Sequence, residues 1–419
     1  MLKPSNFIDF RIGQPDRRCL PAQALLETAR ETLRGPYGRS INSNDPSRFL
    51  QYGSEDGGSC VGALCEFLNR FDHSRKVRLD SNTGLMLSAG NSHAIDLICS
   101  ALSAPHDTIL VESPTYFLAH QIFKDHKLNI VEANFSKKGE VETAIDMHSP
   151  TLAYCVPTYQ NPGASTICES RRVEIVKLIH RHNMTLISDE AYQLLHFASA
   201  SPPPPPFAEI DQHTRQSKTR VQEARQGRVF SCGSFSKIAG PGFRLGWIEG
   251  DADVVNRLAD RGYLNSGGGI SSSLSSSLIE DMICSGKLEE VIVGYRKLYG
   301  ERAVALIEGI SKYCPSVKIH GTRGSGSIEG GYFLWCELPM ISIDNVTVFM
   351  KYCEEHYRLS FLPGDTCFHA RERCERGMVR LCFAMYNCEE LLEGARRLGA
   401  AIESYPTIPS EVELSTIDY

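Results

Sequence analysis

The chain of 419 residues contains no apolar run approaching the roughly 20 residues that a membrane-spanning helix needs. It also lacks an excess of positive charge, since the formal net charge is −6 and the pI is near 6.1, which gives no general electrostatic reason to bind nucleic acid or an anionic membrane. Residues Met1–Phe10 lack the basic start and apolar core of a signal peptide. The sequence therefore predicts a cytosolic protein with no nucleic-acid or membrane partner.

The 15 cysteines include no Cys-x-x-Cys pair, and the 13 histidines show no zinc-binding spacing. Most cysteines, such as Cys155 and Cys382, sit in apolar segments where a thiol acts as a small hydrophobic group. We therefore expect reduced cysteines and no metal site. No internal repeat is present, and 42% hydrophobic and 22% charged residues are typical of a globular chain with a large and a smaller domain.

The chemistry of the sequence centres on residues 229–247, where polar residues lie between two short apolar runs. We expect these runs to be buried strands, which places the polar loop at a strand end, where ligand crevices of α/β sheets open. In such a crevice Lys237 would lose hydration of its ammonium form, so its pKa would fall and its amine could condense with an aldehyde. Ser234, Ser236 and Arg244 suit a phosphate group. An aldehyde and a phosphate on one small molecule indicate pyridoxal 5'-phosphate; the alternative is an ordinary lysine in a Ser/Gly-rich loop.

The sequence SFSK, followed by Gly-Pro-Gly-Phe-Arg, resembles the lysine motif of the class I/II aminotransferases of fold type I, and most of all their kynurenine and 2-aminoadipate aminotransferase branch. The resemblance runs over residues 10–402, with the family's motifs in order. It implies an α/β fold, in which a large domain with a mostly parallel seven-stranded sheet between helices is joined to a smaller α+β domain. The implied bounds are 1–47 for an N-terminal arm and part of the small domain, 48–290 for the large cofactor-binding domain, and 291–419 for the small domain.

A second candidate element is a glycine turn that leads from a short strand into a helix at Gly90, Asn91 and Ser92. Amides at a helix N-terminus carry partial positive charge and can bind the cofactor phosphate, although Asn91 or Ser92 could also cap the helix without any ligand. The resemblance implies two further cofactor contacts. Tyr116 would pack on the pyridine ring, and Asn161 would donate a hydrogen bond to its oxygen O3'.

Asp189 follows a buried apolar strand, where a carboxylate is costly unless it pairs with a positive group. The protonated pyridine nitrogen of the cofactor would be such a partner, and its protonation would make the ring an electron sink. The resemblance implies that Tyr192 is a second donor to O3'. We therefore expect Lys237, Asp189 and Tyr192 to be the catalytic residues, with a capping aspartate and a packing tyrosine as the alternative.

Candidate substrate contacts lie near both ends of the chain. Arg380 is the polar member of the apolar run 378–383, and the resemblance implies that it binds the substrate α-carboxylate, for which its planar fork is suited. The alternative is an edge-strand arginine in a salt bridge. The resemblance also places Gly13, of an F-x-x-G-x-P motif, and Asn161 at the substrate. Aromatic residues within 332–335 suggest aromatic or long apolar substrate side chains, unless they belong to the core.

Tyr52 lies in a Tyr-Gly motif ahead of a predicted helix over 61–69. In the family, the tyrosine of this motif reaches the cofactor phosphate of the neighbouring subunit. The resemblance therefore implies a homodimer with shared active sites, while a turn tyrosine that only packs is the alternative.

Five consecutive prolines, Pro202–Pro206, precede a polar run that continues to Gln226. Prolines in series stay extended and cannot form a helix or a sheet ladder. The pattern therefore predicts a surface insertion over 200–227, either a solvated loop or a partner-binding segment.

The sequence thus predicts an aminotransferase that moves an amino group between an amino acid, aromatic or 2-aminoadipate-like, and a 2-oxo acid. A lyase that catalyses β- or γ-elimination or replacement is the first alternative, because it uses the same cofactor and lysine. A non-catalytic pyridoxal-phosphate-binding regulator is the second, and the acidic charge of the chain disfavours it.

Overall fold

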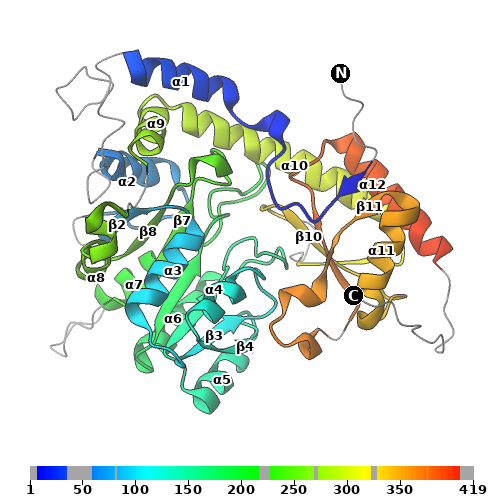
Figure 1. Ribbon diagram of the computed structural model, residues 1–419, viewed down its shortest axis with the longest axis horizontal. Helices are drawn as coiled ribbons and strands as arrows, with labels where there is room; N and C mark the ends of the chain where they lie inside the picture. The colour runs from blue at the N-terminus through cyan, green and yellow to red at the C-terminus, as the bar shows by residue number, and fades with distance from the viewer. Residues whose placement is uncertain are drawn as a thin grey trace.

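A seven-stranded mixed sheet, the large sheet, forms the centre of the larger part of the molecule (Figure 1). The computed structural model describes residues 7–34, 59–80, 83–216, 227–268, 272–321, 328–374 and 376–405. In spatial order the strands are β2 (Thr83–Ser88), β8 (Gly246–Asp251), β7 (Val229–Ser234), β6 (Thr185–Asp189), β5 (Leu152–Cys155), β3 (Thr108–Glu112) and β4 (Asn129–Ala133). Strand β8 runs antiparallel to both of its neighbours and all other pairs are parallel, so the predicted mostly parallel sheet is confirmed.

Alternate residues of the central strands face two separate cores, as the two-residue period of a strand requires. Ile109 and Val111 of β3 belong to one core and Leu110 to the other. The first core includes α2 (Ser59–Phe71), α3 (Asn91–Leu102), α4 (Ala119–Asp125) and α8 (Ala252–Ala259). The second includes α5 (Glu140–His148), α6 (Glu169–Arg181) and α7 (Phe207–Gln216). Helices therefore cover both faces of the sheet, which explains why its strands read as continuous apolar runs.

A smaller antiparallel sheet, the small sheet, lies at the other side of Figure 1. Its order is β12 (Leu362–Pro363), β13 (Met378–Cys382), β10 (Phe333–Glu337) and β9 (Lys318–His320). The accompanying helices are α11 (Val346–Tyr357), α12 (Cys388–Ser404) and α10 (Lys287–Tyr313), and α10 spans the distance between the two sheets. This arrangement confirms the predicted smaller α+β part.

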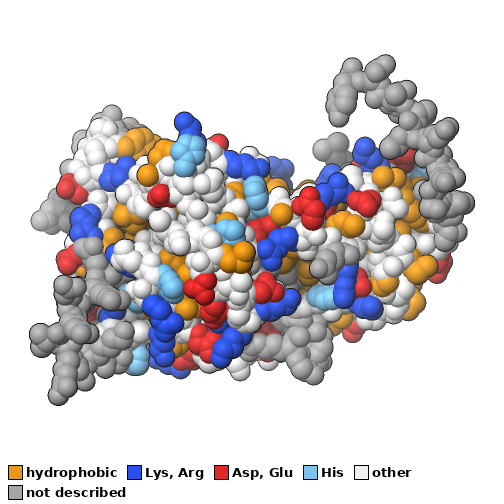
Figure 2. Space-filling model, turned by 90° about the horizontal axis from the view of Figure 1, so that it is seen from below, with side chains coloured by type: hydrophobic (Ala, Val, Ile, Leu, Met, Phe, Trp, Pro, Cys, Tyr) orange, Lys and Arg blue, Asp and Glu red, His pale blue; other side chains and the backbone are white. Residues whose placement is uncertain are grey.

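The N-terminal segment belongs to both parts of the molecule. Strand β1 (Ile8–Asp9) pairs in parallel with β11 (Leu359–Ser360), beside the small sheet. Helix α1 (Ala22–Arg34) instead packs against α9 (Ser273–Cys284), next to the large sheet. The domain bounds at 47 and 290 stay a prediction. In the part of the chain that the structure describes, no helix is long and apolar enough to cross a membrane, and on the face shown in Figure 2 acidic and basic side chains are interspersed.

The expected surface insertion over 200–227 is wrong for its first half. Pro203, Pro205 and Pro206 are buried, and the polar run behind them forms helix α7, whose Phe207 and Ile210 join the second core. The sequence pattern failed here because the proline carbonyls find hydrogen-bond donors inside the protein. Residues 217–226 lie outside the described part of the chain.

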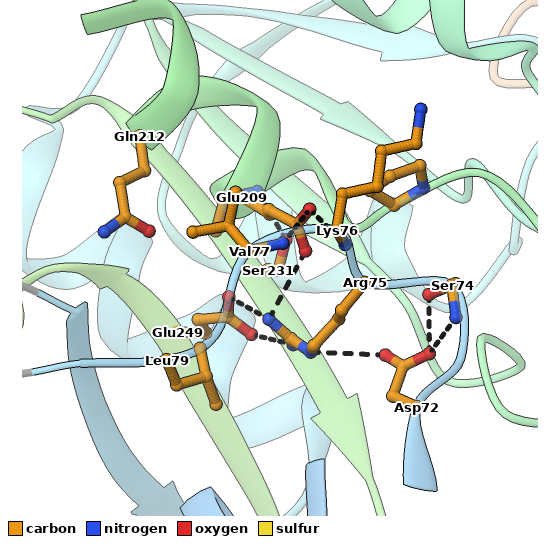
Figure 3. Close-up of polar contacts among 12 residues, drawn as sticks. Asp72, Ser74, Arg75, Lys76, Val77, Leu79, Glu209, Gln212, Ser231 and Glu249 are labelled. Atoms are coloured by element: carbon orange, nitrogen blue, oxygen red, sulfur yellow. Dashed lines mark hydrogen bonds and ion pairs between the residues drawn. The ribbon is translucent and has the colours of Figure 1, made fainter. Parts of the chain in front are cut away.

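A buried ion cluster joins three elements at the antiparallel end of the large sheet (Figure 3). Arg75 Nη1 donates to Glu249 on β8 at 2.9 Å, and Arg75 also pairs with Asp72, just after α2, at 3.3 Å and with Glu209 on α7 at 3.9 Å. Burial raises the pKa of Glu209 to about 7, although two backbone amides that donate to its carboxylate offset part of this effect. A single guanidinium therefore faces three carboxylates, and its one positive charge cannot neutralise all of them.

Glu209→Gln is expected to stabilise the protein at pH 8 and to lose most of this advantage at pH 5. The pKa of Glu209 is higher in the folded protein than its ordinary 4.5. Its favourable contribution to the free energy of unfolding is therefore complete below pH 4.5 and is lost as the pH rises through about 7. The neutral amide avoids that loss, which we expect to be worth about 1 kcal/mol at pH 8. Urea unfolding at both pH values measures the difference in the free energy of unfolding between the variant and the wild type, with Glu66→Gln at an exposed position as the control. An equal gain at the two pH values would contradict this explanation.

Candidate active site

A cavity of about 400 Å³ lies at the carboxyl ends of β5, β6 and β7, with Phe333 and Arg380 of the small sheet in its wall. Parallel strands all end at this edge of the sheet, so residues distant in sequence meet there. The predicted site residues that line it are Gly13, Asn91, Ser92, Tyr116, Asn161, Asp189, Tyr192, Ser234, Ser236, Lys237, Arg244 and Arg380. Gly90 lies against Arg244, and Tyr52 lies outside the described residues.

Lys237 lies in the loop that follows β7. Burial removes water from its ammonium group and lowers its pKa to about 8. Its Nζ donates to the carbonyl of Gly13 at 2.8 Å and lies 5.3 Å from the ring centroid of Tyr332, whose hydroxyl donates to the carbonyl of Lys237. The path of the loop is fixed by close packing, because a Cβ on Gly233 would lie 2.0 Å from the indole of Trp247. The lysine is thus held with a pKa near physiological pH, as the sequence predicts.

Asp189 ends β6 and is only 6% exposed. Its carboxylate accepts a hydrogen bond from Asn91 Nδ2 at 2.6 Å and another from the hydroxyl of Tyr154 at 3.1 Å. Burial raises the pKa of Asp189, and within the described residues it forms no ion pair. A protonated ring nitrogen would supply the missing positive partner, so this carboxylate fits the pyridine ring of pyridoxal phosphate.

Two contacts of Asp189 were not part of the sequence-based expectation. The side chain of Asn91 donates to Asp189 and to the carbonyl of Cys232, so it supports the carboxylate, while the predicted phosphate contact of this turn concerns its backbone amides. Tyr154 was missed altogether. Its signal was a tyrosine inside an otherwise apolar run, on the strand that pairs with β6 and in register with Ile187, two residues before Asp189.

Polar groups suited to a phosphate gather at the start of α3. Gly90 has a φ of 90°, and a Cβ there would lie 3.0 Å from Arg244 Nη2, so glycine leaves room for the guanidinium beside the helix N-terminus. Ser92, Ser234 and Ser236 line the same part of the site, and the amide of Ser236 donates to Ser234 Oγ. An arginine, three hydroxyls and a helix N-terminus fit a phosphate dianion.

Arg380 lies on β13, between β12 and β10, and is 3% exposed. Its Nη1 donates to Asn161 Oδ1 at 2.7 Å and its Nη2 donates to the carbonyl of Arg11 at 2.7 Å. The alternative of an edge-strand arginine in a salt bridge is wrong, since the strand is internal and Arg380 forms no ion pair with any described residue. The amide oxygen of Asn161 is used by Arg380, which leaves its amide nitrogen as a donor. Both side chains therefore fit the predicted contacts.

The remaining predicted residues are aromatic. Tyr116 is half-buried and Tyr192 is buried against Tyr332 and Phe333, with ring centroids 5.4 and 6.1 Å apart. Burial raises the pKa of Tyr192 well above its ordinary value of 10, so its hydroxyl keeps its proton and can donate. Lining residues that sequence reasoning did not single out are Arg11, Gln14, Ile95, Phe117, Leu118, Val156, Ala191 and Pro241.

The chain belongs to the family of class I and II aminotransferases, whose model matches residues 5–398. It is similar to aromatic-amino-acid aminotransferase 1 of Thermococcus litoralis, with 26% identity over 96% of this chain and 89% of that protein, and to 2-aminoadipate transaminase of Thermus thermophilus, with 24% identity over 76% and 75%. The crystal structure of Pyrococcus horikoshii kynurenine aminotransferase matches with a TM-score of 0.78 and 24% identity, over 96% of this chain and 91% of that one. The protein is therefore a fold-type-I aminotransferase that uses pyridoxal phosphate.

Asp189→Asn is expected to leave cofactor binding measurable and to lower kcat by about a hundredfold or more. The amide keeps an acceptor for Asn91 or Tyr154 but loses the negative charge that a protonated ring nitrogen needs. Steady-state kinetics and cofactor titration measure the two effects, with exposed Asp253→Asn as the control. Equal turnover by Asp189→Asn and the unchanged protein would show that this charge has no part in the reaction.

Proposed function

We propose that this aminotransferase moves the amino group of an aromatic amino acid to a 2-oxo acid, with 2-aminoadipate as the competing donor. The observation that carries the choice of an aromatic donor is that Arg11 is already paired with acidic side chains. Arg11 lines the cavity, yet its guanidinium donates to Asp9 at 2.9 Å and lies 3.1 Å from Glu354. A side-chain carboxylate of the substrate would have to compete with both of these acidic groups.

The apolar part of the wall supports the same choice. Ile95, Phe117 and Leu118 line the cavity together with Tyr116 and Phe333, and these groups suit the ring of an aromatic donor. Arg244 and Arg380 also line it, but we assign them to the cofactor phosphate and to the α-carboxylate that every amino acid carries. Lys237 lines it as well and is assigned to the cofactor's aldehyde, so among the described lining residues Arg11 is then the remaining cation for a second carboxylate.

The proposed roles follow from the contacts above. When bound, pyridoxal phosphate supplies an aldehyde for the donor's amine and an electron sink for its α-carbon. Lys237 Nζ would accept the proton from that carbon and deliver it to the carbon of the cofactor that carried the aldehyde, a task for which a pKa of about 8 is suited. Asp189 holds the proton on the ring nitrogen. Arg380 binds the α-carboxylate, while Gly13 forms part of the adjacent wall.

Other side chains bind and orient the cofactor. Asn161 and Tyr192 donate to O3', and Tyr116 packs on the ring. The phosphate is held by the N-terminus of α3 and by the side chains that surround it, namely Ser92, Ser234, Ser236 and Arg244, next to Gly90.

A single-turnover experiment tests the reaction and the donor together. Enzyme loaded with cofactor is mixed with excess donor and no oxo acid. We expect one equivalent of 2-oxo acid per site, then a stop that only an added 2-oxo acid relieves. We also expect kcat/KM for phenylalanine or tyrosine to exceed that for 2-aminoadipate by about tenfold or more.

The alternatives give different results in the same experiment. A lyase would release ammonia or thiol continuously from a suitably substituted donor, and a regulator would bind a donor without releasing product. Higher kcat/KM with 2-aminoadipate would overturn the assignment of an aromatic donor and would leave transamination itself intact.

We also propose that the protein is a homodimer with shared active sites, in which Tyr52 reaches the partner's cofactor phosphate. The resemblance of the Tyr-Gly motif supports this arrangement. Sedimentation should give a dimer. If Lys237→Ala and Tyr52→Phe are each impaired, mixing and reassociating them should restore about a quarter of normal activity, since half of the random pairs are hybrids with one intact site. An active monomer, or no recovery on mixing, would contradict shared sites.

A further inference from the structure

The buried proline run accepts hydrogen bonds from Gln193 and Arg172, and the reaction described above does not explain these contacts. We call residues 202–207 the proline strap. A proline has a carbonyl acceptor but no N–H donor, so a buried run of prolines needs donors from elsewhere. In this protein Gln193 Nε2 donates to the carbonyl of Pro204 at 2.8 Å, and Arg172 Nη1 donates to the carbonyl of Pro205 at 2.9 Å. The strap does not line the active-site cavity.

Arg172, on α6, is fully buried, and its hydrogen bonds to the described residues all go to neutral oxygens. Besides the strap, Nε donates to the carbonyl of Ile167 at 2.9 Å, and Nη2 donates to the carbonyl of Pro157 at 3.0 Å and to Thr158 Oγ1 at 2.7 Å. A guanidinium has five N–H donors in a fixed planar fork and no acceptor, which matches a set of converging carbonyls. One side chain thus ties the strap to both ends of the loop that carries Asn161.

A second contact connects this loop to the one after β6. The hydroxyl of Thr158 donates to Gln193 Oε1 at 2.7 Å, and Gln193 follows Tyr192 directly. The far end of the strap is held next to Asp189, because Glu190 accepts from the amide of Phe207 at 2.9 Å. The strap, Arg172 and Thr158 therefore contact residues that directly adjoin three members of the cavity wall, namely Val156, Asp189 and Tyr192.

The loop around Asn161 needs such support, because its backbone is strained. Tyr159 and Ala164 have φ values of 46° and 55°, in the left-handed region that side chains with a Cβ rarely adopt. Residues in that region persist only where surrounding contacts fix them. The hydrogen bonds from Arg172 to Pro157, Thr158 and Ile167 bracket this stretch.

We propose that Arg172 and Thr158, braced by the proline strap, are positioning residues that fix Asn161 and Tyr192 from behind the cavity. The proposal rests on the roles assigned above to these two side chains. If Asn161 moves away from O3', that oxygen keeps more negative charge and holds a nearby proton more tightly. Its contact with Arg380 is disturbed at the same time, so substrate binding changes together with the cofactor's proton affinity.

The test uses Arg172→Lys, which keeps the charge but loses the fork, and the pair Thr158→Val and Thr158→Ser, of which only serine keeps the hydroxyl. Pro202→Ala, at the exposed end of the strap, is the control. Three quantities are measured: hydrogen exchange of residues 157–163 in the cofactor-free protein, the pH midpoint of the bound cofactor's visible absorbance, and kcat and KM for the best donor.

For Arg172→Lys and Thr158→Val we expect faster exchange in residues 157–163, a midpoint raised by about one unit, and kcat lower by about tenfold or more with a higher KM. Thr158→Ser and Pro202→Ala should resemble the unchanged protein in all three. Thr158→Val is nearly isosteric, so it decides the question if Arg172→Lys does not fold.

Unchanged exchange in residues 157–163 would overturn the proposal even if activity fell. Faster exchange with an unchanged midpoint and unchanged kinetics would overturn it as well, since the loop would then be held without any effect on the cofactor. Failure of the proposed function is distinguishable, because the unchanged enzyme would release no oxo acid from any donor while hydrogen exchange would still report on the hydrogen bonds of Arg172.

Discussion

The burial of a carboxylate at the end of β6 is the constraint on which the site depends. Asp189 has three neutral donors, the side chains of Asn91 and Tyr154 and the backbone amide of Ala191, and no ion pair among the described residues, so its charge is solvated but not neutralised. Such a group is costly in a protein interior unless a positive partner arrives. The nearby Lys237 has its own pKa lowered by burial and points instead to the carbonyl of Gly13. A protonated ring nitrogen of the cofactor is therefore a positive partner that suits this carboxylate.

Much of the fold was predictable, because it depends on local patterns. The apolar runs around 185–189 and 229–234 are the strands β6 and β7, and a strand buried on both faces is apolar throughout. The convergence of Asn161, Asp189 and Lys237 was also predictable, since Asp189 is the last residue of one parallel strand and the other two follow neighbouring parallel strands of the same sheet. For these residues, order along the chain and sheet topology determine the position.

What the sequence could not predict depends on contacts between distant segments. The direction of the Asn91 side chain is set by Asp189, 98 positions away, and no local signal encodes that choice. The prolines looked exposed because carbonyls without N–H partners normally face water, and Arg172 lies 33 positions before the carbonyl of Pro205 to which it donates. Likewise, a polar residue in an apolar run does not reveal whether its strand is at an edge, and β13 proved internal.

Four arginines of this chain show why charge balance, and not residue type, decides what each guanidinium can bind. Arg75 and Arg11 are paired with carboxylates, so an incoming anion gains little from them. Arg172 contacts neutral carbonyls but is fully buried and out of reach of any ligand. Arg380 alone of the four combines neutral partners with a place in the cavity wall. Its charge is therefore uncompensated where a substrate carboxylate would arrive, and this is the physical reason for assigning the α-carboxylate to Arg380 and an uncharged side chain to the space near Arg11.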